Sequence, residues 1–215
     1  MSVPVSGTEG YAEQAEELFE HYESLSALEV HRAILHLIPQ APCRVLDVGS
    51  GTGRDAAWFA DMGHRVVAVE PTDAMRLGAI SLHPSSRIEW LNDCLPDLTF
   101  LRNRSQVFDL VMLTAVWMHL DADQRQRAMP NVASQVAIGG TLIIKLRHGP
   151  VAPGRRMFEV SPEETIELAR NYDLRPVLNL HRNSTSEQNR AAGITWSDLA
   201  FRKEFPDDGA AIAVW

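Results

Sequence analysis

The chain has 215 residues, 45% of them hydrophobic and 22% charged, a composition that is ordinary for globular proteins and excludes a disordered or fibrous chain. Its formal net charge of -8 disfavours non-specific binding to nucleic acid or to an anionic membrane, because such binding depends on lysine and arginine neutralising phosphate. One domain that binds a small molecule is therefore expected, with no nucleic acid or membrane as partner.

The N-terminal residues lack the basic and apolar regions of a secretory signal, and no run of about 18 apolar residues follows. The two cysteines, Cys43 and Cys94, have neither CxxC spacing nor histidines at metal-ligand spacing. We therefore expect a cytoplasmic protein without a disulfide, a metal site or a membrane-spanning segment.

The first helices are predicted between Glu9 and Leu37, where apolar and aromatic residues recur at roughly helical spacing. Two amphipathic helices are expected in this part. Pro39 and Pro42 then end the pattern. The apolar run of residues 44–48 follows and leads into glycines, which is typical of a buried parallel strand.

Short apolar runs then alternate with helical patterns along the chain. Alternation of this kind is typical of a parallel sheet that is covered by helices on both faces. The fold class expected is therefore α/β. The predicted strands of this part span residues 44–48, 65–70, 88–91, 108–113 and 141–146.

The last third of the chain differs in pattern. A helix is predicted over residues 162–171, with Ser161 as its N-cap and a glutamate three residues further on. Residues 174–181 and 194–203 are predicted to form two closing strands. The polar stretch between them, residues 182–192, is interpreted as a loop.

Residues 49–53 place three glycines where the first strand must turn sharply into a helix and allow a ligand close to the backbone. A dinucleotide-binding loop requires G-x-G-x-x-G, but here the third glycine comes one residue early and Arg54 takes its place. Asp47 precedes the loop. Its carboxylate suits a ligand with an amino group and repels a pyrophosphate, so the loop favours S-adenosylmethionine over NAD.

Acidic residues follow the next two predicted strands. Glu70 lies about 20 residues after the first glycine, a distance at which a carboxylate can accept hydrogen bonds from both ribose hydroxyls. Asp93 and Cys94 follow the third strand, where a carboxylate and the next backbone N–H suit the edge of an adenine. The fourth strand leads into Thr114 and the segment up to Leu120, which are expected beside the ligand.

Five segments of the chain belong together in this interpretation: VLDVGSGTGR, VVAVEP, NDCLPDL, FDLVMLTAVWMHL and GGTLIIKLRHGP. They resemble the successive motifs of class I S-adenosylmethionine-dependent methyltransferases, in particular the broad type 11/12 group of small-molecule enzymes. The resemblance spans about residues 41–150. It implies a Rossmann-like, mostly parallel sheet of seven strands with an antiparallel last strand and helices on both faces. It also implies S-adenosylmethionine as cofactor and S-adenosylhomocysteine as product.

The resemblance assigns the cofactor residues position by position. Asp47 and the three glycines are expected to hold the methionine part, and Glu70 the ribose. Asp93 and Cys94 are expected to bind the adenine. The expected cofactor site, within a domain of residues 41–204, comprises Asp47, Gly49, Ser50, Gly51, Gly53, Glu70, Pro71, Asp93, Cys94 and Thr114.

The family motifs do not cover the chain ends, so the expectations there rest on position. Residues 1–40 are interpreted as a helical lid over the cofactor cleft, and residues 205–215 as a C-terminal tail. Tyr11 and Tyr22 lie about three helical turns apart and are expected to share one face of that lid. For both tyrosines the alternative is a packing role in the core.

Residues near the carboxyl ends of the fourth and fifth strands are candidates for catalysis, because ligands of open α/β sheets bind at that edge. Trp117 is expected to line the acceptor pocket together with Arg147. His148 is the first candidate for a general base, since histidine titrates near neutrality. His119 is a further substrate candidate. The alternatives are a solvated loop for Arg147 and His148, and a packed histidine bonded to a backbone carbonyl for His119.

For some residues near the expected site, the sequence allows either contact with a ligand or a purely structural role. Asp55 either contacts the cofactor through water or only interacts with the helix dipole. Arg155 and Arg156 are interpreted as surface charges, with a grip on an anionic acceptor as the alternative. The tryptophans interpreted as core or sheet-facing residues are Trp58, Trp90 and Trp196.

The sequence thus favours an enzyme that transfers a methyl group to the nitrogen or oxygen of a small molecule, accelerated by proximity and orientation. An NAD-dependent oxidoreductase is a rival, opposed by Asp47 and Arg54. A second rival is a non-catalytic module that binds the cofactor, and a third is an enzyme that transfers another group from the sulfonium. The acceptor and the oligomeric state stay open.

Overall fold

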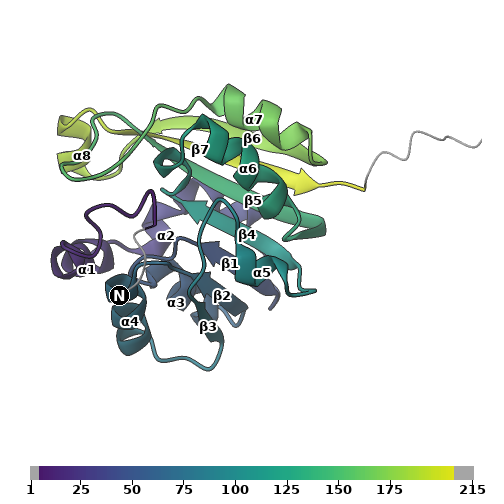
Figure 1. Cartoon of the computed structure of the whole chain (residues 1–215), viewed down its shortest axis with the longest axis horizontal. Helices are drawn as coiled ribbons and strands as arrows, with labels where there is room; N and C mark the ends of the chain where they lie inside the picture. Colours follow the sequence, from purple (N-terminus) through teal and green to yellow (C-terminus); the bar gives the residue numbers. More distant parts are fainter. Residues whose placement is uncertain (1–4, 206–215) are drawn as a thin grey trace, which may run out of the picture.

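A computed structural model describes residues 5–205, which form one sheet of seven strands in the order β3-β2-β1-β4-β5-β7-β6 (Figure 1). Neighbouring strands from β3 to β5 pair in parallel, whereas β7 runs antiparallel to both β5 and β6. The expected Rossmann-like sheet with an antiparallel last strand is confirmed. The strands are β1 (Arg44–Val48), β2 (Arg65–Val69), β3 (Ile88–Leu91), β4 (Phe108–Thr114), β5 (Val136–His148), β6 (Leu174–Asn183) and β7 (Thr195–Lys203).

Helical segments precede the sheet and connect its strands. They are α1 (Ala15–Glu23), α2 (Ala27–Val30), η1 (Arg32–Leu37), α3 (Arg54–Asp61), α4 (Asp73–Leu82), α5 (Thr99–Arg102), η2 (Trp117–His119), α6 (Ala122–Ala133), α7 (Pro162–Arg170) and α8 (Glu187–Ala191).

The central strands are buried on both faces, which explains their nearly continuous runs of valine, leucine and isoleucine. Alternate side chains of a strand point to opposite faces, and here they enter two separate hydrophobic clusters. In β1, Val48 belongs to one cluster with Met129 of α6, and Val45 belongs to the other with Phe59 of α3. Helices therefore cover both faces, as predicted.

The carboxyl ends of β1, β2, β4 and β5 meet at one edge of the sheet. The strand order reverses between β1 and β4, since the chain continues from β1 to β2 on one side and returns to β4 on the other. A reversal of this kind opens a crevice in which α/β sheets bind their ligands. The candidate site is therefore expected at this edge.

The N-terminal segment differs from the two amphipathic helices expected between residues 9 and 37. Helix α1 begins only at Ala15, and Tyr11 lies in a turn before it. Gly10 has a φ of +78°, a left-handed conformation that a regular right-handed helix excludes. The expectation that Tyr11 and Tyr22 share one helix face is therefore wrong.

The C-terminal elements also differ from the prediction in their bounds. β5 is longer than the predicted residues 141–146, because β7 pairs with it as far as His148, opposite Thr195. Residues 182–192, expected as a loop, contain the end of β6 and helix α8. Ser161 caps α7 as predicted, since its Oγ accepts a hydrogen bond of 3.0 Å from the backbone N–H three residues further on.

Among residues 5–205, no helix is both long and apolar enough to cross a membrane. The predicted tail of residues 205–215 lies outside the described residues except for Phe205. The division into a lid of residues 1–40 and a domain of residues 41–204 stays a prediction, and its first four residues also lie outside the described part.

Candidate active site

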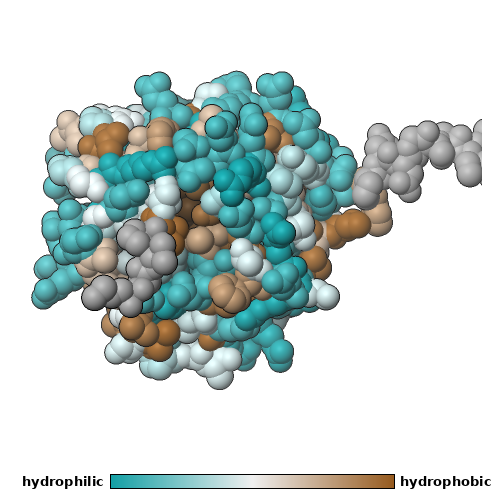
Figure 2. Space-filling model, viewed as in Figure 1, coloured by the Kyte–Doolittle hydropathy of each residue, from teal (hydrophilic) through white to brown (hydrophobic). Residues whose placement is uncertain are grey.

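A cavity of about 430 Å³ lies at the edge where β1, β2, β4 and β5 end. The N-terminal segment covers part of it and contributes side chains between Val5 and Val30. Figure 2 shows apolar residues gathered around a hollow on a face that is otherwise largely hydrophilic. The residues that the N-terminal segment places on the cavity include Thr8, Tyr11, Leu18, Tyr22 and Leu25.

The glycine loop between β1 and α3 forms one wall of the cavity. Gly51 has a φ of +56°, and a Cβ placed on it would meet no atom within 4 Å, so the cavity is open against its backbone. Gly53 differs, because a Cβ there would come within 2.5 Å of Trp90 Cη2, and Gly53 does not line the cavity. Gly53 is therefore held by helix packing, and its place off the cavity wall does not support the expected contact with the cofactor.

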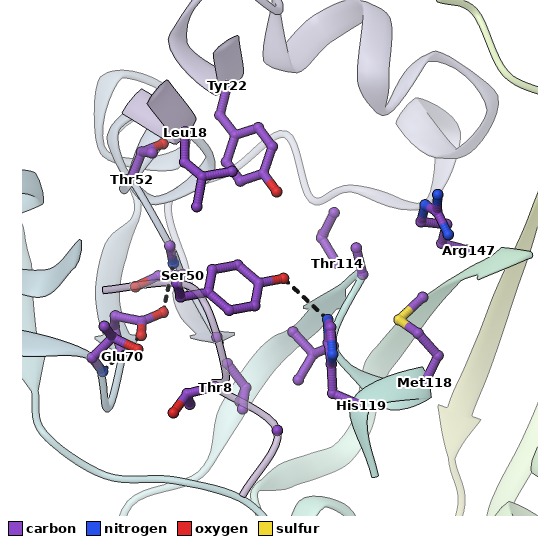
Figure 3. A pocket seen from close by; sticks show the side chains of 18 of the residues that line it. Thr8, Leu18, Tyr22, Ser50, Thr52, Glu70, Thr114, Met118, His119 and Arg147 are labelled. Carbon is purple, nitrogen blue, oxygen red and sulfur yellow. Dashed lines mark hydrogen bonds between the residues drawn. The ribbon is translucent and has the colours of Figure 1, made fainter. Parts of the chain in front are cut away.

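Glu70, directly after β2, holds the glycine loop in place. Its Oε2 accepts a hydrogen bond of 3.0 Å from the Gly51 N–H, and its Oε1 accepts one of 2.8 Å from the Thr72 N–H. Burial raises the pKa of Glu70, and the two backbone hydrogen bonds oppose that rise. The carboxylate also lines the cavity (Figure 3), and each oxygen has a lone pair left for a ligand hydroxyl.

Asp47 carries a buried carboxylate, of which at least one oxygen has no hydrogen-bond partner among the described residues. The residue is 2% exposed, and its Oδ2 has no hydrogen-bond partner among the described residues. Burial, followed by the nearby Asp55 carboxylate, raises the pKa of Asp47 well above its usual range. A cationic group in the cavity would favour the ionised carboxylate and satisfy the free oxygen. Asp47 therefore fits the amino group of an amino-acid ligand.

Asp55 also lines the cavity, but its carboxylate already has partners. Oδ2 lies 2.8 Å from His31 Nε2, and Oδ1 accepts a hydrogen bond of 2.8 Å from Arg54 Nε. Burial opposes ionisation, yet His31 and Arg54 hold the pKa of Asp55 well below its usual range. His31 is fully buried and stacks on Trp58 with a centroid distance of 5.5 Å. Asp55 therefore joins the N-terminal segment to α3.

The loop after β3 uses both oxygens of Asp93 internally. Oδ1 accepts a hydrogen bond of 2.9 Å from the Cys94 N–H, and Oδ2 accepts one of 2.8 Å from the Leu101 N–H. Asp93 and Cys94 line the cavity, but the Cys94 N–H is occupied, contrary to the expectation that it meets an adenine. Ser50 Oγ and Thr114 Oγ1 have no partner among the described residues. The other expected cofactor residues on the cavity wall are Gly49, Ser50, Pro71 and Thr114.

Tyr11 and His119 form a hydrogen-bonded pair on the cavity wall. Tyr11 Oη lies 3.0 Å from His119 Nε2, and His119 Nδ1 lies 2.7 Å from the Arg156 carbonyl oxygen. Because a carbonyl can only accept, Nδ1 carries the proton, and in the neutral ring Nε2 accepts from the Tyr11 hydroxyl. Burial lowers the pKa of His119 and raises that of Tyr11, which favours this neutral pair.

Arg147 lines the cavity from the end of β5 and has no acidic partner among the described residues. Its guanidinium donates to Met157 Sδ at 3.9 Å. Trp196 lies opposite it on β7 and also lines the cavity, so of the two interpretations of Trp196, core or sheet-facing, the structure does not support the core. Arg155 lies over the Tyr11 ring at 4.0 Å from the centroid and lines the cavity as well.

Trp117, expected to line the acceptor pocket, does not reach the cavity. It is fully buried in the hydrophobic cluster on one face of the sheet. Its neighbours Val116 and Met118 line the cavity instead. The 3-10 turn η2 (Trp117–His119) explains the difference, because successive side chains of such a turn point in different directions.

His148 also lies away from the cavity. Its Nε2 lies 2.9 Å from Ser197 Oγ, and its ring centroid lies 5.6 Å from that of His181. Arg147 and His148 are successive residues of one strand, so their side chains point to opposite faces of the sheet. Arg147 lines the cavity and His148 does not, so His148 is not retained as a candidate base.

Sequence reasoning missed several residues of the cavity. They are ordinary apolar or small residues far apart along the chain, so no local pattern distinguishes them. Only the packing of the N-terminal segment and of residues 152–157 onto the sheet edge brings them together. The missed residues include Gly7, Leu25 and Met157.

A family profile described as a methyltransferase domain matches residues 45–140. These residues are similar to a methyltransferase domain. An uncharacterized methyltransferase of Bacillus pumilus is 28% identical over 136 residues, which are 62% of this chain and 57% of that relative. Glycine N-methyltransferase of Oryctolagus cuniculus is 30% identical over 148 residues, 58% of this chain and 50% of that relative. The chain spans about half the length of the curated relatives it matches.

The fold also has a counterpart among solved structures. The 1,6-didemethyltoxoflavin-N1-methyltransferase of Burkholderia thailandensis, solved with 1,6-didemethyltoxoflavin and S-adenosylhomocysteine, aligns with a TM-score of 0.66 and 22% identity. The alignment covers 95% of this chain and 94% of that one. At this identity the likeness concerns the fold, which is that of class I methyltransferases. The resemblance inferred from the five motif segments is confirmed.

Proposed function

We propose that the protein is an enzyme that transfers the methyl group of S-adenosylmethionine to the nitrogen or oxygen of a small-molecule acceptor. The observation that carries the proposal is the buried, unpartnered Oδ2 of Asp47 in the cavity to which the Gly51 backbone is open. An amino group satisfies this oxygen. A pyrophosphate would instead set negative charge against Asp47, which argues against an NAD-dependent oxidoreductase.

Each end of the cofactor has matching groups in this chain. Asp47 would hold the amino group, and the loop backbone with the Ser50 hydroxyl would hold the rest of the methionine part. Glu70 would accept hydrogen bonds from the ribose hydroxyls. Asp93 and Pro71 would border the adenine. The bound cofactor supplies a methyl group on a positively charged sulfur, and the chain contributes binding, orientation and proton transfer.

Tyr11 and His119 take the place that His148 had in the sequence-based interpretation. The acceptor's N–H or O–H would donate to Tyr11 Oη, and the Tyr11 proton would pass to His119 Nε2 as the acceptor atom forms its bond to the methyl group. The Arg156 carbonyl keeps accepting from His119 Nδ1 throughout. General-base assistance of this kind raises the rate of a reaction by a factor of about 10²–10⁴.

The size and lining of the cavity favour a small-molecule acceptor. A volume of about 430 Å³ lies within the usual range of small-molecule sites, roughly 300–1,000 Å³. The net charge of -8 disfavours a nucleic acid substrate. The N-terminal segment covers the cavity, and such a cover excludes water from the reacting groups.

Calorimetry on the full chain tests the cofactor. S-adenosylhomocysteine should bind and NAD should not. Tight NAD binding without heat from S-adenosylhomocysteine would refute the proposal.

Turnover then tests the activity. The full chain is incubated with S-adenosylmethionine and a panel of small amines, phenols and carboxylic acids, and S-adenosylhomocysteine is quantified by mass spectrometry. Release that depends on one acceptor supports methyl transfer, and a matching mass gain of that acceptor excludes transfer of another group. Cofactor binding without release on any acceptor supports the non-catalytic module.

A further inference from the structure

Arg147 holds a position on the acceptor side of the cavity. It lies at the end of β5, paired across the sheet with Trp196 of β7, whereas the glycine loop and Glu70 follow β1 and β2. Two strand positions, β1 and β4, separate β2 from β5 in the sheet. Figure 3 shows Arg147 and Glu70 at opposite sides of the cavity. The cofactor groups therefore occupy one part of the cavity, and Arg147 faces another.

The guanidinium of Arg147 lacks the counter-ion that buried arginines normally have. A guanidinium carries five N–H donors, and a partly buried charge without an acceptor is unfavourable. Within residues 5–205, its hydrogen bond goes to the sulfur of Met157, a weak acceptor. Burial lowers the pKa of Arg147 accordingly. Several other arginines of the described chain that lie buried or half-buried do pair with a carboxylate, among them Arg54, Arg125 and Arg182.

Apart from one ion pair, the charges in the cavity are separated by sign. The four acidic residues of the cavity follow or flank the strands β1 to β3 and are Asp47, Asp55, Glu70 and Asp93. Arg54 also lines this part, but it pairs with Asp55. Arg147 and Arg155 lie on the other part, beside the apolar side chains of Met157 and Trp196. Arg155 stacks on the Tyr11 ring and donates to the Glu9 carbonyl oxygen at 3.3 Å. Of these two arginines, Arg147 is therefore the one whose guanidinium has no oxygen partner.

We propose that the methyl acceptor carries a carboxylate that binds Arg147, while its apolar part packs against Trp196 and Met157. This inference rests on the proposed function and names the class of its substrate. A guanidinium pairs with a carboxylate through two parallel hydrogen bonds, which fixes the orientation of the bound molecule as well as its affinity. The acceptor atom is thereby held at a fixed distance from its own carboxylate, near Tyr11.

The experiment measures binding of two isosteric probes, benzoate and the neutral benzamide, by calorimetry on the full chain with and without saturating S-adenosylhomocysteine. Benzoate should bind about tenfold or more tightly than benzamide, because only benzoate forms charge-assisted hydrogen bonds with Arg147. Arg147→Gln should abolish this preference, and Arg147→Lys should retain part of it because it keeps the charge but loses the paired geometry. Phenyl phosphate serves as a third probe.

Arg202→Gln is the matched control, since Arg202 lies at the far end of β7, bonds the Gly139 carbonyl oxygen and does not line this cavity. It should bind both probes like the parent. Equal binding of benzoate and benzamide by the parent, or no binding of either, would overturn the inference. So would tighter binding of phenyl phosphate, or an Arg147→Gln variant that loses S-adenosylhomocysteine and keeps the benzoate preference. If the parent itself does not bind S-adenosylhomocysteine, the proposed function is refuted instead. The titration of benzoate and benzamide without cofactor still measures binding at Arg147 in that case.

Discussion

At Asp47 the requirements of folding and of cofactor binding oppose each other. Its carboxylate is buried beside that of Asp55, and its pKa in the folded protein is raised well above the usual range. The unfolded chain therefore releases this proton at a lower pH than the folded chain does. The contribution of Asp47 to stability is consequently lost as pH rises from its ordinary pKa through the raised one.

We predict that Asp47→Asn stabilises the free protein and weakens cofactor binding. The amide removes the buried charge, so the melting temperature at pH 7 should rise. The lost charge-assisted hydrogen bond should raise the Kd for S-adenosylhomocysteine about tenfold or more. Asp55→Asn is the control, because it breaks the pair with His31 and should lower the melting temperature. An Asp47→Asn variant that binds like the parent would remove Asp47 from the site.

Two glycines of the loop allow packing and ligand approach to be separated. Gly51→Val should abolish S-adenosylhomocysteine binding, because its side chain would project into the cavity. The left-handed conformation adds a cost of about 1–2 kcal/mol to folding, so circular dichroism must show that the variant is folded. Gly53→Ala should mainly destabilise the fold, since its Cβ would meet the Trp90 ring at 2.5 Å. If folded Gly51→Val binds cofactor normally, the loop is only a turn.

Sequence patterns located the cofactor residues better than the acceptor residues. The glycine loop and Glu70 lie within a few residues of strand ends, so spacing along the chain determines where they sit. Trp117 and His148 were placed by nearness in sequence alone, which does not give the direction of a side chain. For His148 the alternation of β5 was available as a signal, since it places Arg147 and His148 on opposite faces of the sheet.

A buried cluster of charges joins the N-terminal segment to the sheet. Lys145 Nζ lies 2.6 Å from Asp198 Oδ1 and donates to the Val30 carbonyl oxygen at 3.1 Å. Arg182 Nε bonds the other oxygen of Asp198 at 2.6 Å. The cluster thereby connects the end of α2 to three adjacent strands, β5, β7 and β6. It gives the cover of the cavity a fixed attachment at one point.

We predict that Lys145→Met lowers the free energy of unfolding by about 3 kcal/mol. This loss is near the lower end of the range for breaking a buried ion pair, because Arg182 still pairs with Asp198. Chemical denaturation measures the change. Arg175→Gln is the control, because it breaks the exposed pair with Glu204 and should cost about 0–1 kcal/mol. Equal losses in the two variants would contradict the structural role of the buried cluster.

Hydrogen exchange tests whether the N-terminal segment acts as a lid. Amides from Gly10 to Glu23 should exchange readily in the free protein and slow when S-adenosylhomocysteine is added, as expected of an element that closes over a ligand. Residues 27–37 should be protected in both states, because the Lys145 cluster and the pair between His31 and Asp55 hold them. Protection confined to the glycine loop and Glu70 would show that α1 is a packing element.

The order of the elements could be predicted from the sequence, whereas the shape of the N-terminal segment could not. Buried parallel strands give long apolar runs, and their alternation with helical patterns determines the fold class. The N-terminal segment is short, begins α1 only after the left-handed Gly10, and is held by tertiary contacts at Val30 and His31. Local propensity is a weak guide to such a segment, because packing overrides it.

At the scale of the whole molecule, the sheet divides the cavity into two chemically distinct parts. The strands β1 to β3 carry the acidic groups that suit a ligand with an amino group and hydroxyls. The strands β4, β5 and β7, with the N-terminal segment, carry Arg147, Trp196 and the pair of Tyr11 and His119. A bound acceptor would therefore meet the transferred group where the two parts join, at the reversal of strand order between β1 and β4.

This division predicts two separate pH dependences on the acid side of the activity profile. Asp47 must be ionised to bind the cofactor, so kcat/KM for the cofactor should fall as pH drops through the raised pKa of Asp47 in the free enzyme. His119 must be neutral to accept a proton, and burial lowers its pKa, so kcat should stay level around neutrality and fall only below the ordinary range of histidine.

His119→Gln and His148→Gln distinguish the two candidate bases. His119→Gln should lower kcat by about 10²–10⁴ and abolish the acid limb of kcat, because the group that titrates is gone. The acid limb of kcat/KM for the cofactor should remain, since Asp47 is unchanged. His148→Gln should keep both limbs and a kcat near that of the parent, because the His148 ring bonds Ser197 away from the cavity. If His148→Gln instead removes the limb in kcat and His119→Gln leaves it, then His148 is the base and the pair of Tyr11 and His119 only holds the N-terminal segment in place.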